Sequence, residues 1–122
     1  MARITGIGGI FIKSRDPKAL SAWYRDILGL DVQSWGGALL KHSPQSPDTA
    51  VWNAFEDGTN YFAPSTREAM INFAVDDLAA FLTQLEAKGV AVLGREKMDG
   101  MGSFAWIMDP DGTKIELWQP EK

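Results

Sequence analysis

Residues 10–20 read IFIKSRDPKAL, and 61 positions later residues 71–81 read INFAVDDLAAF. Both stretches pass from alternating apolar residues, through a carboxylate suited to start a helix, into an amphipathic segment. The offset is half of the 122-residue chain, which indicates two copies of one unit. One such unit cannot bury its own sheet face, so we expect the two copies to pair around a shared cavity.

Each copy contains one expected helix. Asp16 can cap the first helix with Pro17 at its first position, and either Asp76 or Asp77 can cap the second. Each helix carries one apolar stripe and ends at a glycine. The first has Leu20, Trp23, Tyr24, Ile27 and Leu28 in its stripe and ends at Gly29; the second has Leu78, Phe81, Leu82 and Leu85 and ends at Gly89.

The remaining segments are expected to form strands and turns. Apolar and other residues alternate over 71–75, and tight turns are predicted at 35–38 and at Asp111-Gly112. Further strands are expected at 30–35, 38–42, 50–55, 90–93, 103–108 and 113–118, whereas 43–48 and 94–102 are expected to be irregular and 57–68 to link the copies.

The sequence therefore predicts an α+β fold. We expect two tandem β-α-β-β-β modules, at approximately 1–62 and 68–122, within a single domain spanning 1–122. The eight strands would form a curved mixed sheet around a cavity, with the helices outside.

Composition limits the partners. The net charge of −4 and the isoelectric point near 4.9 argue against nucleic acid, which requires a basic surface. No apolar run approaches the roughly 20 residues that span a bilayer, so no membrane association is expected. The chain has no cysteine, in keeping with a cytoplasmic location.

Two stretches resemble one known superfamily. They run from Asp16 through Trp23 and Tyr24 to Leu30, and over residues 108–117, which read MDPDGTKIEL. On the 61-residue repeat, they are similar to the vicinal oxygen chelate superfamily, which includes glyoxalase I, bleomycin-resistance proteins and extradiol dioxygenases. The resemblance covers nearly the whole chain and implies the paired-module fold.

The resemblance also locates the positions at which family members hold a divalent metal. Glu116 matches the metal-binding glutamate of the closing hairpin, whereas Gly9 and Met70 stand at the two first-strand ligand positions. The first-module counterpart of Glu116 is Trp52, Asn53, Phe55 or Asn60, none of which is a usual ligand in the family. We therefore expect no metal and no other cofactor, with a divalent metal at an atypical site as the alternative.

Glu116 is the first candidate site residue. It alternates with Ile115 and Leu117, so it should face the cavity. Three interpretations stay open: a carboxylate paired with Lys114, Lys13 or solvent, a ligand anchor, or a catalytic base.

Other residues are candidates for the walls of the site. Phe11, Trp52 and Trp106 could stack against a flat ligand, although strand aromatics more often serve packing. Asn72 places a polar amide at a cavity-facing position, where it needs a partner. His42, the single histidine, occupies no ligand position of the family and is interpreted as a surface residue.

The function predicted from these observations is a metal-independent small-molecule binding protein of the glyoxalase/bleomycin-resistance type. The alternative is an enzyme of the superfamily, either a lyase, an isomerase or a dioxygenase, that uses Glu116 as a base or in an atypical metal site. We also expect a homodimer, since open sheets leave edges and apolar surface to cover. The sequence does not identify the ligand.

Overall fold

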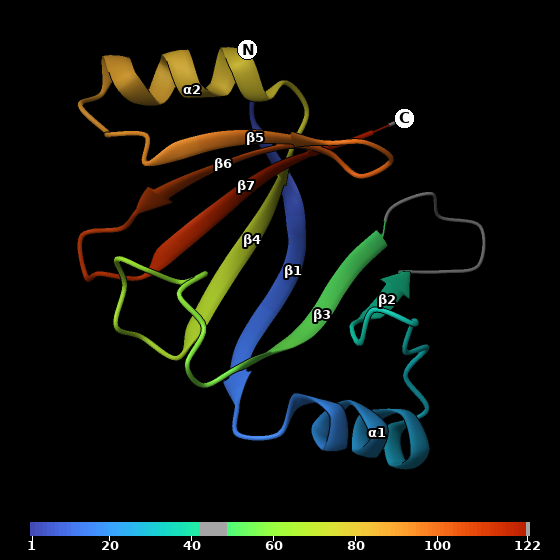
Figure 1. Cartoon of the computed structure of the whole chain (residues 1–122). Helices are drawn as coiled ribbons and strands as arrows, with labels where there is room; N and C mark the ends of the chain where they lie inside the picture. The colour runs from blue at the N-terminus through green and yellow to red at the C-terminus, as the bar shows by residue number, and fades with distance from the viewer. Residues whose placement is uncertain (42–48, 122) are drawn as a thin grey trace.

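The protein is α+β, and the computed structural model describes residues 1–41 and 49–121. The elements in chain order are β1 (Ile4–Ser14), α1 (Pro17–Leu28), β2 (Ala38–Lys41), β3 (Thr49–Glu56), β4 (Ala69–Val75), α2 (Leu78–Ala87), β5 (Gly94–Met98), β6 (Gly102–Met108) and β7 (Lys114–Pro120), as Figure 1 shows. No helix within the described ranges is long and apolar enough to cross a membrane.

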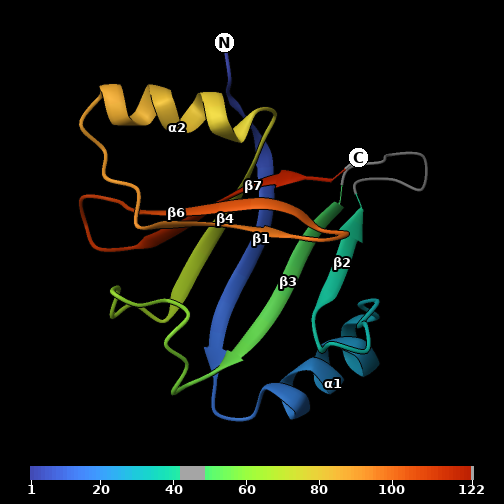
Figure 2. The same ribbon diagram turned by 45° about the horizontal axis from the view of Figure 1, so that its top comes forward.

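The strands form one mixed, open sheet in the order β2-β3-β1-β4-β7-β6-β5. The antiparallel pair of β1 and β4 joins the two copies at the centre, and each of these strands has a parallel neighbour, β3 or β7. The sheet twists strongly, so that β5, β6 and β7 cross the direction of β1 and β3 (Figures 1 and 2). This arrangement is typical of twisted sheets.

The eight-strand prediction was wrong for the described part of the chain, which holds seven strands. Residues 30–35 do not form a strand; only Val32 makes an isolated bridge, to Ala38. The chain turns at once after this bridge, because the Gln33 N–H donates to the Gly37 carbonyl at 2.8 Å. The first copy therefore lacks one expected strand, whereas the second has the full order β4, α2, β5, β6 and β7.

The predicted position of the strand after α2 was also wrong. Residues 90–93 are irregular, and the strand lies at Gly94–Met98, within the segment expected to be an irregular lip. Its central residues Arg95, Glu96 and Lys97 are charged, so the segment lacks the apolar alternation from which a strand is predicted. Because β5 is an edge strand with β6 as its neighbour in the sheet, its charged side chains remain exposed and also discourage pairing with another chain.

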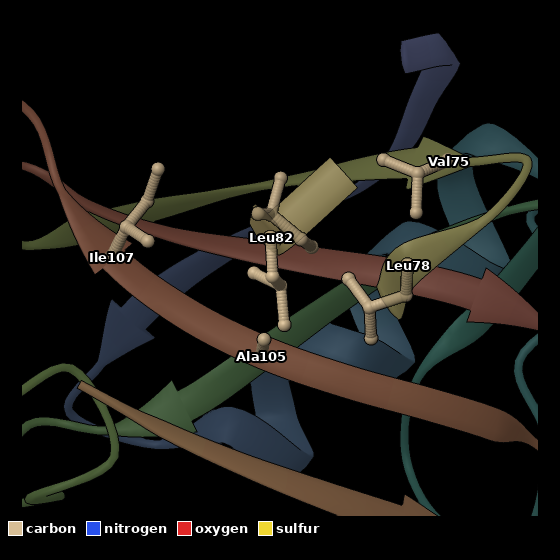
Figure 3. Packing of buried hydrophobic residues seen from close by; sticks show 6 residues of the cluster. Val75, Leu78, Leu82, Ala105 and Ile107 are labelled. Atoms are coloured by element: carbon tan, nitrogen blue, oxygen red, sulfur yellow. The ribbon is translucent and has the colours of Figure 1, made fainter. Parts of the chain in front are cut away.

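Both helices start as their sequences predict. Asp16 Oδ1 accepts the Ala19 N–H at 3.1 Å, and Asp77, rather than Asp76, caps α2 by accepting the Ala80 N–H at 3.1 Å. Helix α2 buries Leu78 and Leu82 against Ala105 and Ile107 of the sheet (Figure 3). Leu117 of β7 belongs to the same cluster. This cluster forms the core on the outer face of the second module.

Helix α1 packs less closely than its stripe predicts. Ser21 is buried and donates to the Gly36 carbonyl at 2.8 Å, but Trp23, Ile27 and Leu28 are each at least half exposed. Tyr24 makes the main aromatic contact, lying 4.1 Å between ring centroids from Trp52 of β3. The apolar stripe therefore predicted the helix correctly, but part of the stripe remains an exposed apolar surface.

Candidate functional site

Glu116 lies near the middle of β7 and is 2% exposed. Its neighbours Ile115 and Leu117 pack into the core beneath α2. Successive side chains of a strand point to opposite faces, so Glu116 points to the other face of the sheet, away from α2. This placement agrees with the prediction that Glu116 faces away from Ile115 and Leu117, whereas the cavity expected in front of it stays a prediction.

Three side chains donate hydrogen bonds to this carboxylate. Asn72 Nδ2 donates to Oε1 at 2.6 Å, Trp106 Nε1 donates to Oε2 at 2.7 Å, and the Tyr61 hydroxyl donates to Oε2 as well. Asn72 and Trp106 reach Glu116 because both are its direct neighbours across the sheet, on β4 and β6. Hydrogen bonds to a carboxylate are stronger than neutral ones, so these donors fix its orientation.

Tyr61 was missed by the sequence analysis, which assigned 57–68 to a linker. The signal that could have found it is the aromatic pair Tyr61-Phe62 within a polar segment. Burial, followed by the negative charge of Glu116, raises the pKa of the Tyr61 phenol above its ordinary value. The hydroxyl therefore stays protonated and acts as a donor.

Lys114 lies beside the same group. Its Nζ donates to the Tyr61 carbonyl at 2.6 Å and sits 5.3 Å and 5.5 Å from the ring centroids of Tyr61 and Trp106. Burial lowers the pKa of the Lys114 ammonium, and the Glu116 carboxylate opposes this change. Within the described ranges neither Lys114 nor Lys13 forms an ion pair with Glu116, whose partners are uncharged donors instead.

Asn72 has one unsatisfied atom. Its Oδ1 is buried without a hydrogen-bond partner among the described residues. It lies against the backbone of β1, where a Cβ placed on Gly8 would come within 2.1 Å of it. Rotating the amide would point oxygen at oxygen, so the bond to Glu116 sets its direction.

Apolar side chains surround this group on the same face of the sheet. Phe11, Phe62 and Met70 are buried together, with Phe55 and Trp106 packed against them. The predicted residues Phe11, Asn72, Trp106 and Glu116 therefore lie on one face. The first-module counterpart of Glu116 is Asn53 by register, because Asn53 pairs with Phe11 as Glu116 pairs with Asn72.

Trp52 does not belong to this group. It lies on β3 next to Asn53, so it points to the opposite face, where it contacts Tyr24 of α1. The prediction that Trp52 lines the cavity was wrong. Asn53 and Phe55 are the residues of β3 that point to the Glu116 face, and Trp52, one position from Asn53, points to the other face. His42 lies outside the described residues.

The residues around Glu116 do not fit a divalent metal. In the described ranges no three His, Cys, Asp or Glu side chains come together. Gly9 offers no ligand, and a Cβ there would lie 3.0 Å from the Phe11 ring, while Met70 is fully buried in the apolar cluster. Both carboxylate oxygens already accept bonds from donors, which a cation would have to displace.

Comparisons with known proteins agree with this fold. A family model described as glyoxalase-like domain matches residues 9–118. No curated protein sequence matches the chain.

Solved structures of enzymes share the architecture. Methylmalonyl-CoA epimerase from Streptomyces coelicolor, in complex with 2-nitronate-propionyl-CoA, aligns with a TM-score of 0.73 and 20% identity over 98% of this chain and 100% of that one. The epimerase from Mycobacterium tuberculosis has a TM-score of 0.68, with 22% identity over 98% and 90%. A 2,2',3-trihydroxybiphenyl 1,2-dioxygenase from Sphingomonas wittichii has 0.61, with 22% identity over 98% and 42%. The chain therefore belongs to the glyoxalase-like domain family of the vicinal oxygen chelate superfamily.

Proposed function

We propose that this protein is an enzyme that transfers a proton at a carbon next to a carbonyl group, with Glu116 as the base. The observation that carries the proposal is the buried Glu116 carboxylate, oriented by Asn72, Trp106 and Tyr61 from three separate segments. A general base must be held in a fixed position relative to the proton that it removes. This proposal replaces the binding protein favoured by the sequence alone, because the structures that share the fold include enzymes.

Tyr61 would supply the second group of the reaction. It belongs to the segment between β3 and β4, outside the strands, so its side chain can turn without breaking the sheet. In the proposed step Glu116 Oε2 takes the proton from the substrate carbon, and the carbonyl oxygen gains the negative charge. The Tyr61 hydroxyl, turned away from Glu116, then donates to this oxygen, and the proton returns from Glu116 to carbon.

Lys114 supports the same chemistry. Its ammonium lies over the Tyr61 and Trp106 rings, and both of these residues contact Glu116. A positive charge next to the reacting atoms favours the anionic intermediate. The site thus pairs one carboxylate with a hydroxyl donor and an ammonium group.

The proposed substrate class is a small acyl thioester or related carbonyl compound. Its support is the likeness to epimerases, one of which is solved with methylmalonyl-CoA and another with 2-nitronate-propionyl-CoA. Since the residues around Glu116 do not fit a divalent ion, the proposal includes no metal and no other cofactor.

A test is deuterium exchange. Chelator-treated protein is incubated with methylmalonyl-CoA in D₂O, and mass spectrometry follows deuterium uptake at the carbon next to the thioester. We expect uptake above the buffer rate, unchanged by the chelator. Uptake that requires an added divalent metal would overturn the metal-free mechanism.

Binding without reaction is the second candidate function. It is favoured by one observation: both oxygens of Glu116 already accept hydrogen bonds from protein side chains, an arrangement that also suits a carboxylate with a purely structural role. Saturable binding of the thioester without any deuterium uptake would support this candidate. Absence of both binding and uptake would remove this substrate class from either candidate.

A homodimer is also proposed. The surface formed by Trp23, Ile27 and Leu28 of α1 is apolar and exposed, and burying it against a second copy would be favourable. The cytoplasmic location expected from the sequence stays a prediction.

A further inference from the structure

A cavity lies on the other side of the sheet from Glu116. It has a volume of about 380 Å³ and opens between α2 and the strands β5, β6 and β7. Small-molecule sites usually occupy cavities of roughly 300–1,000 Å³, so this one suits a small ligand. None of the residues of the Glu116 site lines it.

One wall of this cavity is polar. Lys97, Ser103 and Gln119 are direct neighbours across β5, β6 and β7, so their side chains form a row on one face. The row shares its face with Ala105 and Leu117 of the core beneath α2, which places it toward the helix. Gln119 Oε1 accepts the Leu78 N–H at 2.7 Å, which leaves the Gln119 amide NH₂ as a donor.

The charge on this wall is positive. Arg95 and Lys97 lie two residues apart on β5 and so share the face. Arg95 Nη2 is 3.8 Å from Glu86 Oε1, beyond hydrogen-bond length, with both side chains more than half exposed. Lys97 has no ion pair among residues 1–41 and 49–121.

Two carboxylates lie near these cations, and neither is directed at Lys97 from the same face of β5. Glu96 also lines the cavity, but it alternates with Arg95 and Lys97 along β5, so its side chain is directed to the opposite face, where its charge acts on Tyr61. The exposed Glu86 forms a long ion pair of 3.8 Å with Arg95 and does not pair with Lys97. A concave wall with two cations in a chain of net charge −4 favours an anionic ligand.

The facing wall is apolar. Leu78 and Leu82 of α2 line the cavity and are nearly fully buried. A ligand that fills the space must therefore present hydrocarbon toward α2 and an anionic head toward β5. We propose that this cavity binds a small aliphatic carboxylate, with the carboxylate at Arg95 and Lys97 and the chain against Leu78 and Leu82. The proposal is independent of the Glu116 reaction.

Hexanoate is a suitable probe, titrated into ¹⁵N-labelled protein at constant ionic strength and followed by amide chemical shifts. Acetate keeps the charge without the hydrocarbon, and hexan-1-ol keeps the hydrocarbon without the charge. We expect saturable shifts confined to residues 78–82, 95–97, 103–104 and 119, with at least tenfold weaker binding of both control compounds. Equal binding of hexan-1-ol, shifts scattered over the surface, or shifts centred on Glu116 would overturn the proposal.

Variants test the cationic wall directly. Lys97→Gln and Arg95→Gln change exposed side chains and should preserve the amide spectrum of the folded protein. Each should weaken hexanoate binding about three- to tenfold, and the double variant should abolish saturation. Lys88→Gln, at the far end of α2, is the matched control and should bind as wild type does. Unchanged binding in the double variant would contradict the proposal.

Discussion

Replacing Gly8 by alanine tests how tightly the Glu116 site is assembled. Gly8 is buried in β1, and a Cβ there would lie 2.1 Å from Asn72 Oδ1 and 3.0 Å from Trp118 Cε3. Ordinary contact begins at 3.4 Å, so the Asn72 oxygen must retreat by about 1.3 Å (3.4 minus 2.1). Asn72 is 2% exposed, and it cannot move this far and keep its 2.6 Å bond to Glu116.

The expected cost follows from these contacts. Losing a hydrogen bond to a carboxylate costs about 1.5–3 kcal/mol. Forcing an extra methyl group into a packed interior typically costs ~1–3 kcal/mol, and the reduced freedom of the unfolded chain returns about 0.4–1 kcal/mol. Because both costs come from one displacement and are not additive, we expect Gly8→Ala to lower the free energy of unfolding by about 2–4 kcal/mol.

Urea unfolding followed by tryptophan fluorescence measures this change. Gly6→Ala is the matched control, because Gly6 lies on the same strand and a Cβ there would meet nothing within 4 Å. It should change the free energy of unfolding by less than about 1 kcal/mol. In an Asn72→Ala background the cost of Gly8→Ala should shrink, because the 2.1 Å contact with Oδ1 is gone and only the 3.0 Å contact with Trp118 Cε3 remains. Equal stability of the two alanine variants, or a full cost that persists without Asn72, would refute the packing described for this site.

Three further predictions concern Tyr61, Trp52 and α1. The unfolded chain releases the tyrosine proton near the ordinary pKa of 10.0, whereas burial and Glu116 raise the pKa of folded Tyr61, so the folded state binds more protons above that pH. The stability that Tyr61 adds relative to Tyr61→Phe should therefore be full below pH 10 and fall as pH rises; a pH-independent difference in urea unfolding from pH 7 to 11 would count against this. Trp52→Leu should lower the free energy of unfolding by about 1–3 kcal/mol through its contact with Tyr24 and leave deuterium exchange unchanged, whereas a loss of exchange without destabilisation would return Trp52 to the site. Light scattering at micromolar concentration should give the mass of a dimer for wild type and of a monomer for Trp23→Glu, and a monomeric wild type would contradict the proposed dimer.

Much of the architecture was accessible from the sequence because local chemistry determined it. Asp16 and Asp77 cap helices for reasons confined to one turn, and the alternation around Glu116 fixes its direction on the sheet. Both signals act over a few residues and need no knowledge of distant partners. The superfamily resemblance on residues 108–117 then gave the correct fold family.

The errors arose where the partner of a segment decided its structure. Residues 94–98 form a strand because they pair with β6 at the edge of the sheet. Their charged side chains show no apolar alternation from which a strand could be predicted. Tyr61 reaches Glu116 from a segment with no regular structure, over a separation of 55 residues that no local pattern records. The face to which Trp52 points was predicted wrongly, because an error of one residue in the alternation of a strand assigns a side chain to the opposite face.

The rate of deuterium uptake in the Glu116→Gln variant is the most direct test of the central claim. The amide keeps the shape of the side chain but cannot accept the substrate proton, and removing a general base typically lowers a rate by about 10²–10⁴-fold. Glu56→Gln, on the exposed end of β3, is the control and should exchange as wild type does. With chelator-treated protein and methylmalonyl-CoA, we predict that Glu116→Gln binds the thioester but takes up deuterium at least about 100-fold more slowly than wild type. Uptake by Glu116→Gln at the wild-type rate would contradict the assignment of Glu116 as the base.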